Sequence, residues 1–364
     1  MNFKKFSYIF LIITIGFVLF NALIWNISTK NILTNNDGVI SGDMARMGYL
    51  SDMVHARKND INLPKQHITT KLYNFEKLDM LTLGDSFSQG NVGGQNRYYQ
   101  DFIATYMNWN ILNVGKYFKA NEIETIIALA HSGFFKTSAV KYVLYQSTQR
   151  KVVDRLTANI NFDFPATFQE VIEHYQFNKT TQNQKIQSLP KTSFINNGNF
   201  KFLLYNFLYN FSDHGFVSKV YIAKTKKDLF SIRPYNKFLF YKQDLKAIKK
   251  STQKNIEKAN YTLNKLAALL KKQNIKLIFM PAVSKYDLYS KYMLDNPYRK
   301  DPFFDIFRNM DKNYIFIDTK KILTKELDNG EKDIYYLDDT HWSYKASDVI
   351  AQHIQKELSK QWEL

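Results

Sequence analysis

The chain has 364 residues, which is long enough for one large domain or two ordinary ones with a sizeable core. Hydrophobic residues make up 45% and aromatic residues 16%, so the composition excludes a chain that is disordered as a whole. The absence of Cys excludes a disulfide framework, a thiolate metal site and a cysteine nucleophile.

The formal net charge of +17 is compatible with binding to nucleic acid, but only 8 of the 50 basic residues are Arg. Base readout and bidentate phosphate recognition favour Arg over Lys. We therefore predict no nucleic-acid partner, and interpret the Lys excess as compositional bias with tolerance for an anionic surface or glycan.

The amino terminus resembles a membrane anchor. Lys4 and Lys5 precede an uncharged stretch from Tyr8 to Trp25, close to the ~20 residues that a helix needs to cross a bilayer. A cleavable signal peptide is the alternative, but no small-x-small cleavage site lies between Phe20 and Trp25. We expect residues 1–29 to form an uncleaved single-pass anchor with its start in the cytoplasm.

Residues 30–77 are mixed in polarity and carry the turn signals Asn35-Asn36-Asp37-Gly38, Ser41-Gly42 and Pro64. This pattern predicts a stalk or an irregular layer against the following domain. The segment from Asp43 to Tyr49 is assigned no chemistry.

From Leu78 onward, short apolar runs alternate with helical stretches. Strands are predicted at 78–83, 109–114, 140–145, 276–280 and 314–317, and helices at 98–107, 122–135, 253–272 and 344–358. Such alternation is typical of an α/β fold with a parallel sheet, in which ligands bind beyond the carboxyl ends of the strands.

Residues 152–252 show neither period clearly, and we interpret them as an insertion in the domain 78–364 that caps the site. Aromatic residues are frequent between Phe162 and Tyr241. We expect them to fill a core, with stacking on sugars as the alternative.

The first motif with chemical potential is Gly84-Asp85-Ser86, at the end of the first predicted strand. Gly84 allows a sharp turn, and the Ser86 hydroxyl would lie over the sheet edge with its own N–H free to stabilise an oxyanion. The alternative is an ordinary strand-to-loop turn with a capping Ser.

The second motif is Asp338-Asp339-Thr340-His341-Trp342, directly before the last predicted helix. Serine is a weak nucleophile that needs a neighbouring base, and that base needs a carboxylate to fix its tautomer. The short Asp-to-His spacing supplies both groups on one loop. The alternative is a solvated loop whose His packs under Trp342.

The two motifs together resemble those of the SGNH (GDSL-type) hydrolase superfamily, whose members have a flavodoxin-like three-layer α/β/α sandwich. Asp339-Thr340-His341-Trp342 is similar to the form found in the membrane-anchored branch of alginate and cell-wall polysaccharide O-acetyltransferases. The resemblance covers residues 78–140 and 275–364, and leaves out the middle of the chain.

The resemblance implies Ser86 as the nucleophile and His341 as the general base. The superfamily spacing selects Asp338 as the orienting acid and the acetyltransferase spacing selects Asp339, which we prefer. The Ser86 and Gly115 N–H groups would form the oxyanion hole.

The third superfamily block, Gly-x-Asn-Asp, is absent, and Tyr145-Gln146-Ser147-Thr148-Gln149-Arg150 stands in its place. Gln146 or Gln149 is the candidate third donor to the oxyanion. Arg150 and Trp342 are candidate substrate contacts, and a polar strand-end loop is the alternative for Arg150.

These patterns predict a serine O-acyltransferase, most simply an O-acetyltransferase, that modifies a cell-envelope polysaccharide from the outer side of the bacterial cytoplasmic membrane. The alternatives are an acetylesterase or lipase with the same residues, and an inactive glycan-binding or assembly subunit. The resemblance implies a membrane-bound partner that delivers acyl groups. No cofactor is predicted, and no metal, because the other histidines lack paired-ligand spacing.

Overall fold

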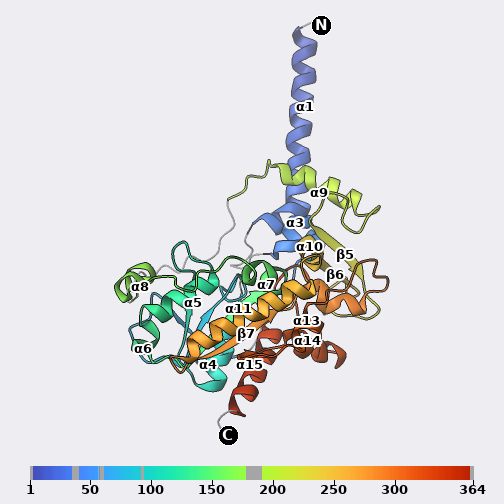
Figure 1. Cartoon of the computed structure of the whole chain (residues 1–364). Helices are drawn as coiled ribbons and strands as arrows, with labels where there is room; N and C mark the ends of the chain where they lie inside the picture. Colours follow the sequence, from blue (N-terminus) through green and yellow to red (C-terminus); the bar gives the residue numbers. More distant parts are fainter. Residues whose placement is uncertain are drawn as a thin grey trace.

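The computed structural model describes residues 3–34, 41–55, 57, 61–91, 94–177 and 191–360. The turn predicted at Asn35-Asn36-Asp37-Gly38 lies outside these residues. A long amino-terminal helix projects from a rounded α/β body, and the two chain ends lie at opposite ends of the molecule (Figure 1).

The projecting segment is one continuous helical rod. It consists of α1 (Phe3–Ile24), the π-helical turn η1 (Trp25–Thr29) and α2 (Lys30–Leu33). Over the 31 residues from Phe3 to Leu33 it is long and apolar enough to cross a membrane, and among the described residues it is the one helix that meets this criterion. Within α1 only Asn21 is buried, so the apolar side chains of this helix find almost no protein to pack against.

The body is built on a six-stranded sheet in the order β1-β3-β2-β4-β7-β8, in which every pair is parallel. The strands are β1 (Ile68–Thr69), β2 (Met80–Leu83), β3 (Ile111–Val114), β4 (Tyr142–Thr148), β7 (Lys276–Ala282) and β8 (Ile315–Phe316). Apart from the edge strand β1, this is the 2-1-3-4-5 order of flavodoxin-like folds. The predicted fold class is confirmed.

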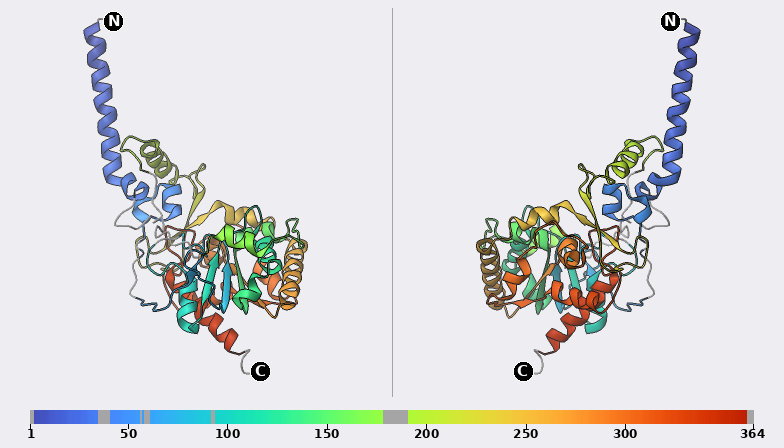
Figure 2. Two further views of the ribbon diagram at one scale, coloured as in Figure 1. Left: turned by 90° about the vertical axis from the view of Figure 1, so that its left-hand side faces the viewer. Right: turned by 90° about the vertical axis from the view of Figure 1, so that its right-hand side faces the viewer.

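Helices cover both faces of the sheet, which explains why β2 and β4 are buried along their whole length. One face carries α4 (Tyr99–Met107), α14 (Thr319–Asp328) and α15 (Tyr344–Ser359) (Figure 2). The other face carries α5 (Glu122–His131), α7 (Gln149–Leu156) and α11 (Gln253–Lys271). The short helices are α3 (Asp43–Gly48), α6 (Phe134–Ser138), α8 (Phe168–Tyr175), α9 (Asn197–Leu208), α10 (Lys242–Ile248), α12 (Lys285–Tyr289) and α13 (Phe303–Arg308), with 3₁₀ turns at Ser51–Met53 and Ser290–Tyr292.

Two predicted boundaries are wrong for local physical reasons. The helix expected over 122–135 breaks at Gly133, whose φ of +79° lies in the left-handed region that glycine adopts easily. The strand expected to end at Tyr145 continues to Thr148, and α7 begins at the next residue. Gln146 therefore lies in a buried strand, and Gln149 and Arg150 lie on a helix.

The middle region contains regular structure that its sequence pattern does not reveal. β5 (Val220–Lys224) and β6 (Lys237–Tyr241) form a two-stranded antiparallel sheet. Its buried side chains Phe238 and Phe240 pack against Tyr289 and Tyr286 of α12, with ring centroids 5.4 and 5.2 Å apart. These two phenylalanines fill a core, as expected, whereas others between Phe162 and Tyr241, such as Phe207 and Phe211, are more than half exposed.

The register of the sheet brings the predicted motifs to one edge. Leu83, the last residue of β2, pairs with Val114 on one side and with Tyr145 on the other. The residues that follow, Gly84 and Gly115 among them, therefore leave the sheet at its carboxyl edge.

Candidate active site

The turn after β2 presents Ser86 and is held by Asp85. The Asp85 carboxylate accepts hydrogen bonds from the Phe87 N–H at 3.3 Å, the Thr148 N–H at 2.7 Å and the Arg155 guanidinium at 2.6 Å. Burial raises the pKa of Asp85, but Arg155 and these hydrogen bonds outweigh burial and hold the pKa below its ordinary value. Asp85 is thus an ionised anchor that ties the Ser86 turn to the end of β4 and to α7.

Gly84 and Gln146 form the tightest packing beneath this turn. The Gln146 Oε1 accepts from the Asp85 N–H and from Ser88 Oγ, both at 3.1 Å. A Cβ added at Gly84 would lie 2.2 Å from Ser88 Oγ and 2.4 Å from Gln146 Oε1. Close approach, rather than an unusual backbone angle, therefore requires glycine here.

Gly84→Ala is expected to displace the Ser86 turn. Ser88 Oγ and Gln146 Oε1 are hydrogen-bonded to each other, and the Gln146 Cβ on buried strand β4 would lie only 2.9 Å from the new methyl group, so we expect the turn to shift. A shift of about 1 Å near reacting groups costs roughly 10²-fold in rate. Ester hydrolysis by purified Gly84→Ala protein would measure this loss. Gly16→Ala, at a glycine of α1 with no atom within 4 Å of the added methyl group and no left-handed backbone angle, is the matched control.

Ser86, His341 and Asp339 form a continuous hydrogen-bonded relay. Ser86 Oγ lies 2.7 Å from His341 Nε2, and His341 Nδ1 lies 2.6 Å from Asp339 Oδ1. Asp339 Oδ1 also accepts from the His341 backbone N–H at 3.0 Å. A carboxylate only accepts hydrogen bonds, so Nδ1 carries the proton and Nε2 is left to accept from the serine hydroxyl. The structure thus joins residues that are 255 positions apart.

The charges of this relay stabilise one another. Burial lowers the pKa of His341, but the neighbouring Asp339 carboxylate outweighs burial, and the pKa lies above the ordinary value of 6.5. The Asp339 carboxyl is also buried, which raises its pKa, yet His341 and Arg57 hold the pKa far below its usual range. Asp339 therefore stays ionised wherever His341 titrates.

Activity should rise with pH as His341 loses its proton. Only neutral His341 can accept the Ser86 proton, and the Asp339 carboxylate favours the charged imidazolium. We expect the ascending limb of kcat/KM, measured between about pH 5 and 9, to have an apparent pKa above that of free His. In Asp339→Asn the limb should move to lower pH, and an unchanged limb would contradict the assignment of His341 as the titrating base.

The structure separates the two candidate acids. Asp338 turns away from His341, and its carboxylate accepts from Arg57 at 2.8 and 3.2 Å and from the Gly42 N–H at 2.8 Å. The side chain is fully buried. Asp339 thus contacts the imidazole, while Asp338 holds the loop.

Residues shortly after α2, which the sequence analysis left without chemistry, bind this loop directly. Asp43 accepts from the Thr340 N–H at 2.8 Å and from Thr340 Oγ1 at 2.6 Å, and its own N–H donates to Asp339 Oδ2 at 3.1 Å. The Asp338 carbonyl accepts from the N–H groups of Met44 and Ala45. Burial and the nearby Asp339 charge raise the pKa of Asp43. We call residues 41–57 the amino-terminal clamp.

Arg57 and Lys285 supply the buried positive charge next to the two acids. The Arg57 guanidinium contacts both carboxylates and lies over the Tyr336 ring at 4.6 Å. Lys285 Nζ donates to the carbonyls of Tyr336, Leu337 and Asp339 at 2.6, 2.8 and 3.2 Å. Burial lowers the pKa of Lys285 to about 7 against the opposing pull of the carboxylates. Neither role could be found from sequence, because the groups that Arg57 and Lys285 contact lie 281 and 51 positions away in the chain.

The N–H groups predicted for the oxyanion hole follow two adjacent strands, Ser86 after β2 and Gly115 after β3. Among the described residues, the Ser86 and Gly115 N–H groups have no hydrogen-bond acceptor, and space around Gly115 is open on the side where a Cβ would stand. The Gln146 amide oxygen is occupied by the hydrogen bonds from the Asp85 N–H and Ser88 Oγ. Its buried Nε2 has no hydrogen-bond partner among the described residues. Gln149 is engaged elsewhere, with Asp287, Asp301 and the Ser284 N–H.

The two candidate substrate contacts differ in their surroundings. Arg150 lies 3.3 Å from Asp244 and over the Tyr241 ring, and its charge reaches His341, whose pKa it lowers slightly. Trp342 is only 4% exposed and packs edge-on against Phe87, with ring centroids 4.6 Å apart. Its indole is covered by protein, and its contact with substrate stays a prediction.

One cluster has the composition of a metal site. Ligand atoms of Asp43, Asp339 and His341 lie within 4.8 Å of one another. Each of these groups already has a protein partner: Thr340 for Asp43, Arg57 for Asp339, and Ser86 for the second imidazole nitrogen. We interpret the cluster as a hydrogen-bonded network.

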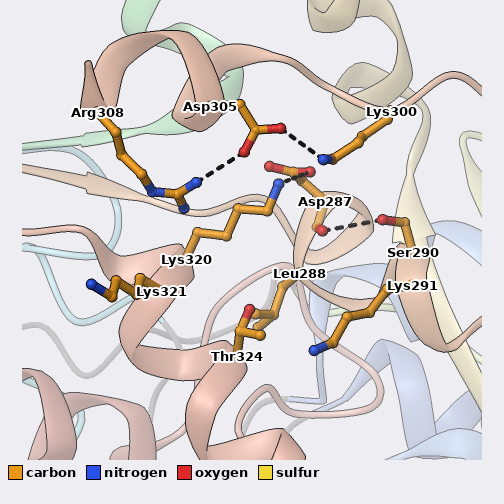
Figure 3. Close-up of a pocket in the computed structure, with 10 residues that line it drawn as sticks. All are labelled: Asp287, Leu288, Ser290, Lys291, Lys300, Asp305, Arg308, Lys320, Lys321 and Thr324. Carbon is orange, nitrogen blue, oxygen red and sulfur yellow. Dashed lines mark hydrogen bonds and ion pairs between the residues drawn. The ribbon is translucent and has the colours of Figure 1, made fainter. Parts of the chain in front are cut away.

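A separate polar hollow of about 490 Å³ lies away from this site, between α12, α13 and α14 (Figure 3). Its charged groups pair across the hollow: Lys320 with Asp287 at 2.6 Å, and Asp305 with both Lys300 and Arg308 at 2.7 and 2.9 Å. None of the relay residues lines it.

Comparison with known families gives a match over residues 235–364, to the model described as the SGNH hydrolase-like domain of acetyltransferase AlgX. These residues are similar to the AlgX domain. Asp339 and His341 lie inside the matched segment, whereas Ser86 and Gly115 lie before it. The resemblance stated from the motifs is confirmed over the matched segment, which is similar to an acetyltransferase domain of this superfamily.

Two further comparisons add little. The crystal structure of a lipase from a goat rumen metagenome aligns with a TM-score of 0.34 at 12% identity, covering 77% of this chain and 97% of the lipase. A sequence comparison with curated proteins finds no significant match.

Proposed function

We propose that this protein is a membrane-anchored serine O-acyltransferase that transfers acetyl groups to hydroxyls of a cell-envelope polysaccharide outside the cytoplasm. The observation that carries the proposal is the relay from Ser86 through His341 to Asp339, with distances of 2.7 and 2.6 Å. The AlgX-type match over residues 235–364 supports acetyl as the group transferred and a polysaccharide as the acceptor.

The relay supports a two-step reaction. Ser86 Oγ attacks the carbonyl carbon of the acetyl donor while His341 Nε2 takes the hydroxyl proton, and the Ser86 and Gly115 N–H groups stabilise the oxyanion. The donor's leaving group departs with that proton, which leaves an acetyl-serine ester. A sugar hydroxyl then gives its proton to His341 and attacks this ester, and Ser86 leaves and regains the proton.

The proposed topology rests on the amino terminus. Lys4 and Lys5 lie in the first turn of α1, before its uncharged stretch, and positive charge at the start of a span favours a cytoplasmic start. Residues 1–29 would then be the anchor, and the rest of the chain, including the domain from residue 78 with its insertion at 152–252, would lie outside. Cytosolic acetyl donors do not reach that side, so a membrane-bound partner would deliver the acetyl group.

The test follows the fate of a labelled acetyl group. Full-length protein in detergent receives isotopically labelled p-nitrophenyl acetate with or without candidate envelope polysaccharides, and acetylated sugar and free acetate are measured. A transferase forms acetylated sugar at the expense of acetate, whereas an esterase forms only acetate. Binding of a polysaccharide with neither product would replace the proposal by a non-catalytic subunit. Ser86→Ala should lose both products.

A further inference from the structure

Helix α9 (Asn197–Leu208) presents an apolar face that is about half exposed among the described residues. Phe200, Leu203, Leu204 and Phe207 are 51%, 43%, 51% and 62% exposed. Their spacing of three and four residues places them on one side of the helix. Exposed apolar groups of this size are rare on soluble surfaces unless they bind something.

The apolar face continues past the end of the helix. Phe211 is 63% exposed and contacts Phe207, with ring centroids 5.2 Å apart. Phe216 and Val217, in the following loop, are 59% and 56% exposed. We call Phe200, Leu203, Leu204, Phe207, Phe211, Phe216 and Val217 together the α9 patch.

The opposite face of α9 is fixed to the protein. The Asn206 side chain donates to the Tyr49 carbonyl at 3.0 Å, and Tyr205 meets the Tyr49 ring edge-on at 5.3 Å. The Tyr209 hydroxyl, just after the helix, contacts Ser218 at 2.8 Å. The helix therefore cannot rotate to bury its apolar side without breaking these contacts.

The first turn of α9 is also joined to the membrane-anchor helix. Asn199 is buried, and its amide nitrogen donates to Asn21 Oδ1 at 2.8 Å while its oxygen accepts from Thr29 Oγ1 at 2.6 Å. Phe200 packs against Phe17 and Phe20, with centroids 6.4 and 4.9 Å apart. Figures 1 and 2 show α9 crossing beside the domain-proximal end of α1.

These positions set the depth of α9. A helix needs ~20 residues to cross the hydrocarbon layer, so with Lys4 and Lys5 at one interface the other interface lies near Trp25. Phe17, Phe20 and Asn21 then lie within the outer half of the bilayer. Side chains that pack on them meet lipid, and α9 carries a single charged residue, Lys201, whose side chain is exposed.

We propose that α9 is an interfacial helix whose apolar patch inserts into the outer leaflet of the same membrane that α1 crosses. The inference rests on the proposed anchor and adds a second attachment to it. Two attachments fix the orientation of the domain. Because Ser41 of the amino-terminal clamp donates to the Ile32 carbonyl of α2 at 3.0 Å, the Ser86 edge of the sheet is held on the membrane-proximal side. Such a helix lies with its apolar face about 5–10 Å into the boundary of headgroups and acyl chains.

The absence of Cys makes single-cysteine spin labelling of the full-length chain direct. Phe207→Cys and Phe216→Cys report on the patch, Ile12→Cys reports on the middle of α1, and Tyr261→Cys, at an exposed residue of α11, is the aqueous control. Each labelled protein is reconstituted alone into vesicles of phosphatidylethanolamine and phosphatidylglycerol. Relaxation by oxygen, which concentrates in lipid, is compared with relaxation by a water-soluble nickel chelate, and thermal melts check the fold.

We expect residues 207 and 216 to show oxygen-to-nickel ratios well above that of residue 261 and below that of residue 12. Ratios equal to that of residue 261, with residue 12 protected from nickel, would overturn the interfacial helix and leave the anchor intact. That result would assign the patch to a protein partner, because the vesicles contain none. Nickel access at residue 12 would overturn the anchor and this inference together.

Discussion

Asp339→Asn is expected to lower turnover by about 10⁴-fold, the size of effect that the corresponding change has in a Ser-His-Asp triad. An amide at position 339 can donate a hydrogen bond to His341 Nδ1, which moves the ring proton to Nε2. Nε2 would then face Ser86 Oγ, 2.7 Å away, as a donor, and could no longer take the hydroxyl proton. Steady-state hydrolysis of p-nitrophenyl acetate measures the effect.

Asp338→Asn is the matched control for this prediction. It removes the same charge one residue earlier, where the carboxylate contacts Arg57 and the Gly42 N–H instead of the imidazole. We expect it to lower the melting temperature more than Asp339→Asn does and to reduce turnover far less. Equal turnover losses in the two variants would show that the loop, and not the identity of the acid, governs catalysis.

The second large effect is expected from Arg57→Met. The guanidinium is buried and contacts both acids of the loop, at 2.8 Å for Asp338 and 3.4 Å for Asp339. Removing one partner of a buried ion pair costs about 3–5 kcal/mol, because the remaining charges stay buried without compensation. We therefore expect a lower denaturation midpoint and, since Asp339 loses support, weaker turnover in the folded protein.

Arg299→Met, at an exposed arginine, controls for the loss of one positive charge. Chemical denaturation of both variants and of the unaltered protein gives the stability differences. An Arg57→Met protein as stable and as active as Arg299→Met would mean that the amino-terminal clamp does not hold the loop in solution.

The sheet and the two main motifs could be predicted because each depends on the residue pattern of a short segment of the sequence. The strands predicted at 78–83 and 276–280 are mainly apolar, Ser86 follows the end of a strand, and His341 stands just before a helix. Their meeting follows from the parallel topology, since carboxyl ends of neighbouring strands share one edge.

The choice between Asp338 and Asp339 could not be made from spacing, because it depends on groups from a distant segment. The Asp338 carboxylate accepts hydrogen bonds from Arg57 and the Gly42 N–H, which hold it away from His341. The Asp339 carboxylate accepts from the Asp43 N–H. The sequence pattern of residues 41–57 indicates only a connecting segment between the predicted anchor and the domain. Their role depends on tertiary contacts across almost 300 positions, for which a single sequence carries no signal.

The exposed side of α9 was hidden for a similar reason. Its sequence, from Asn197 to Leu208, is apolar on more than one side, and aromatic residues usually indicate a core. Only the contacts of Asn199 and Asn206 determine which side faces the protein.

The most direct test of the central claim is mass spectrometry of the protein after brief exposure to p-nitrophenyl acetate and an acid quench, without any acceptor. The account predicts a gain of one acetyl group, mapped to the peptide that contains Ser86, lost in Ser86→Ala and kept in Ser88→Ala, whose hydroxyl is buried against Tyr99. An adduct that survives in Ser86→Ala, or a folded protein that gains no acetyl group at any quench time, would contradict it.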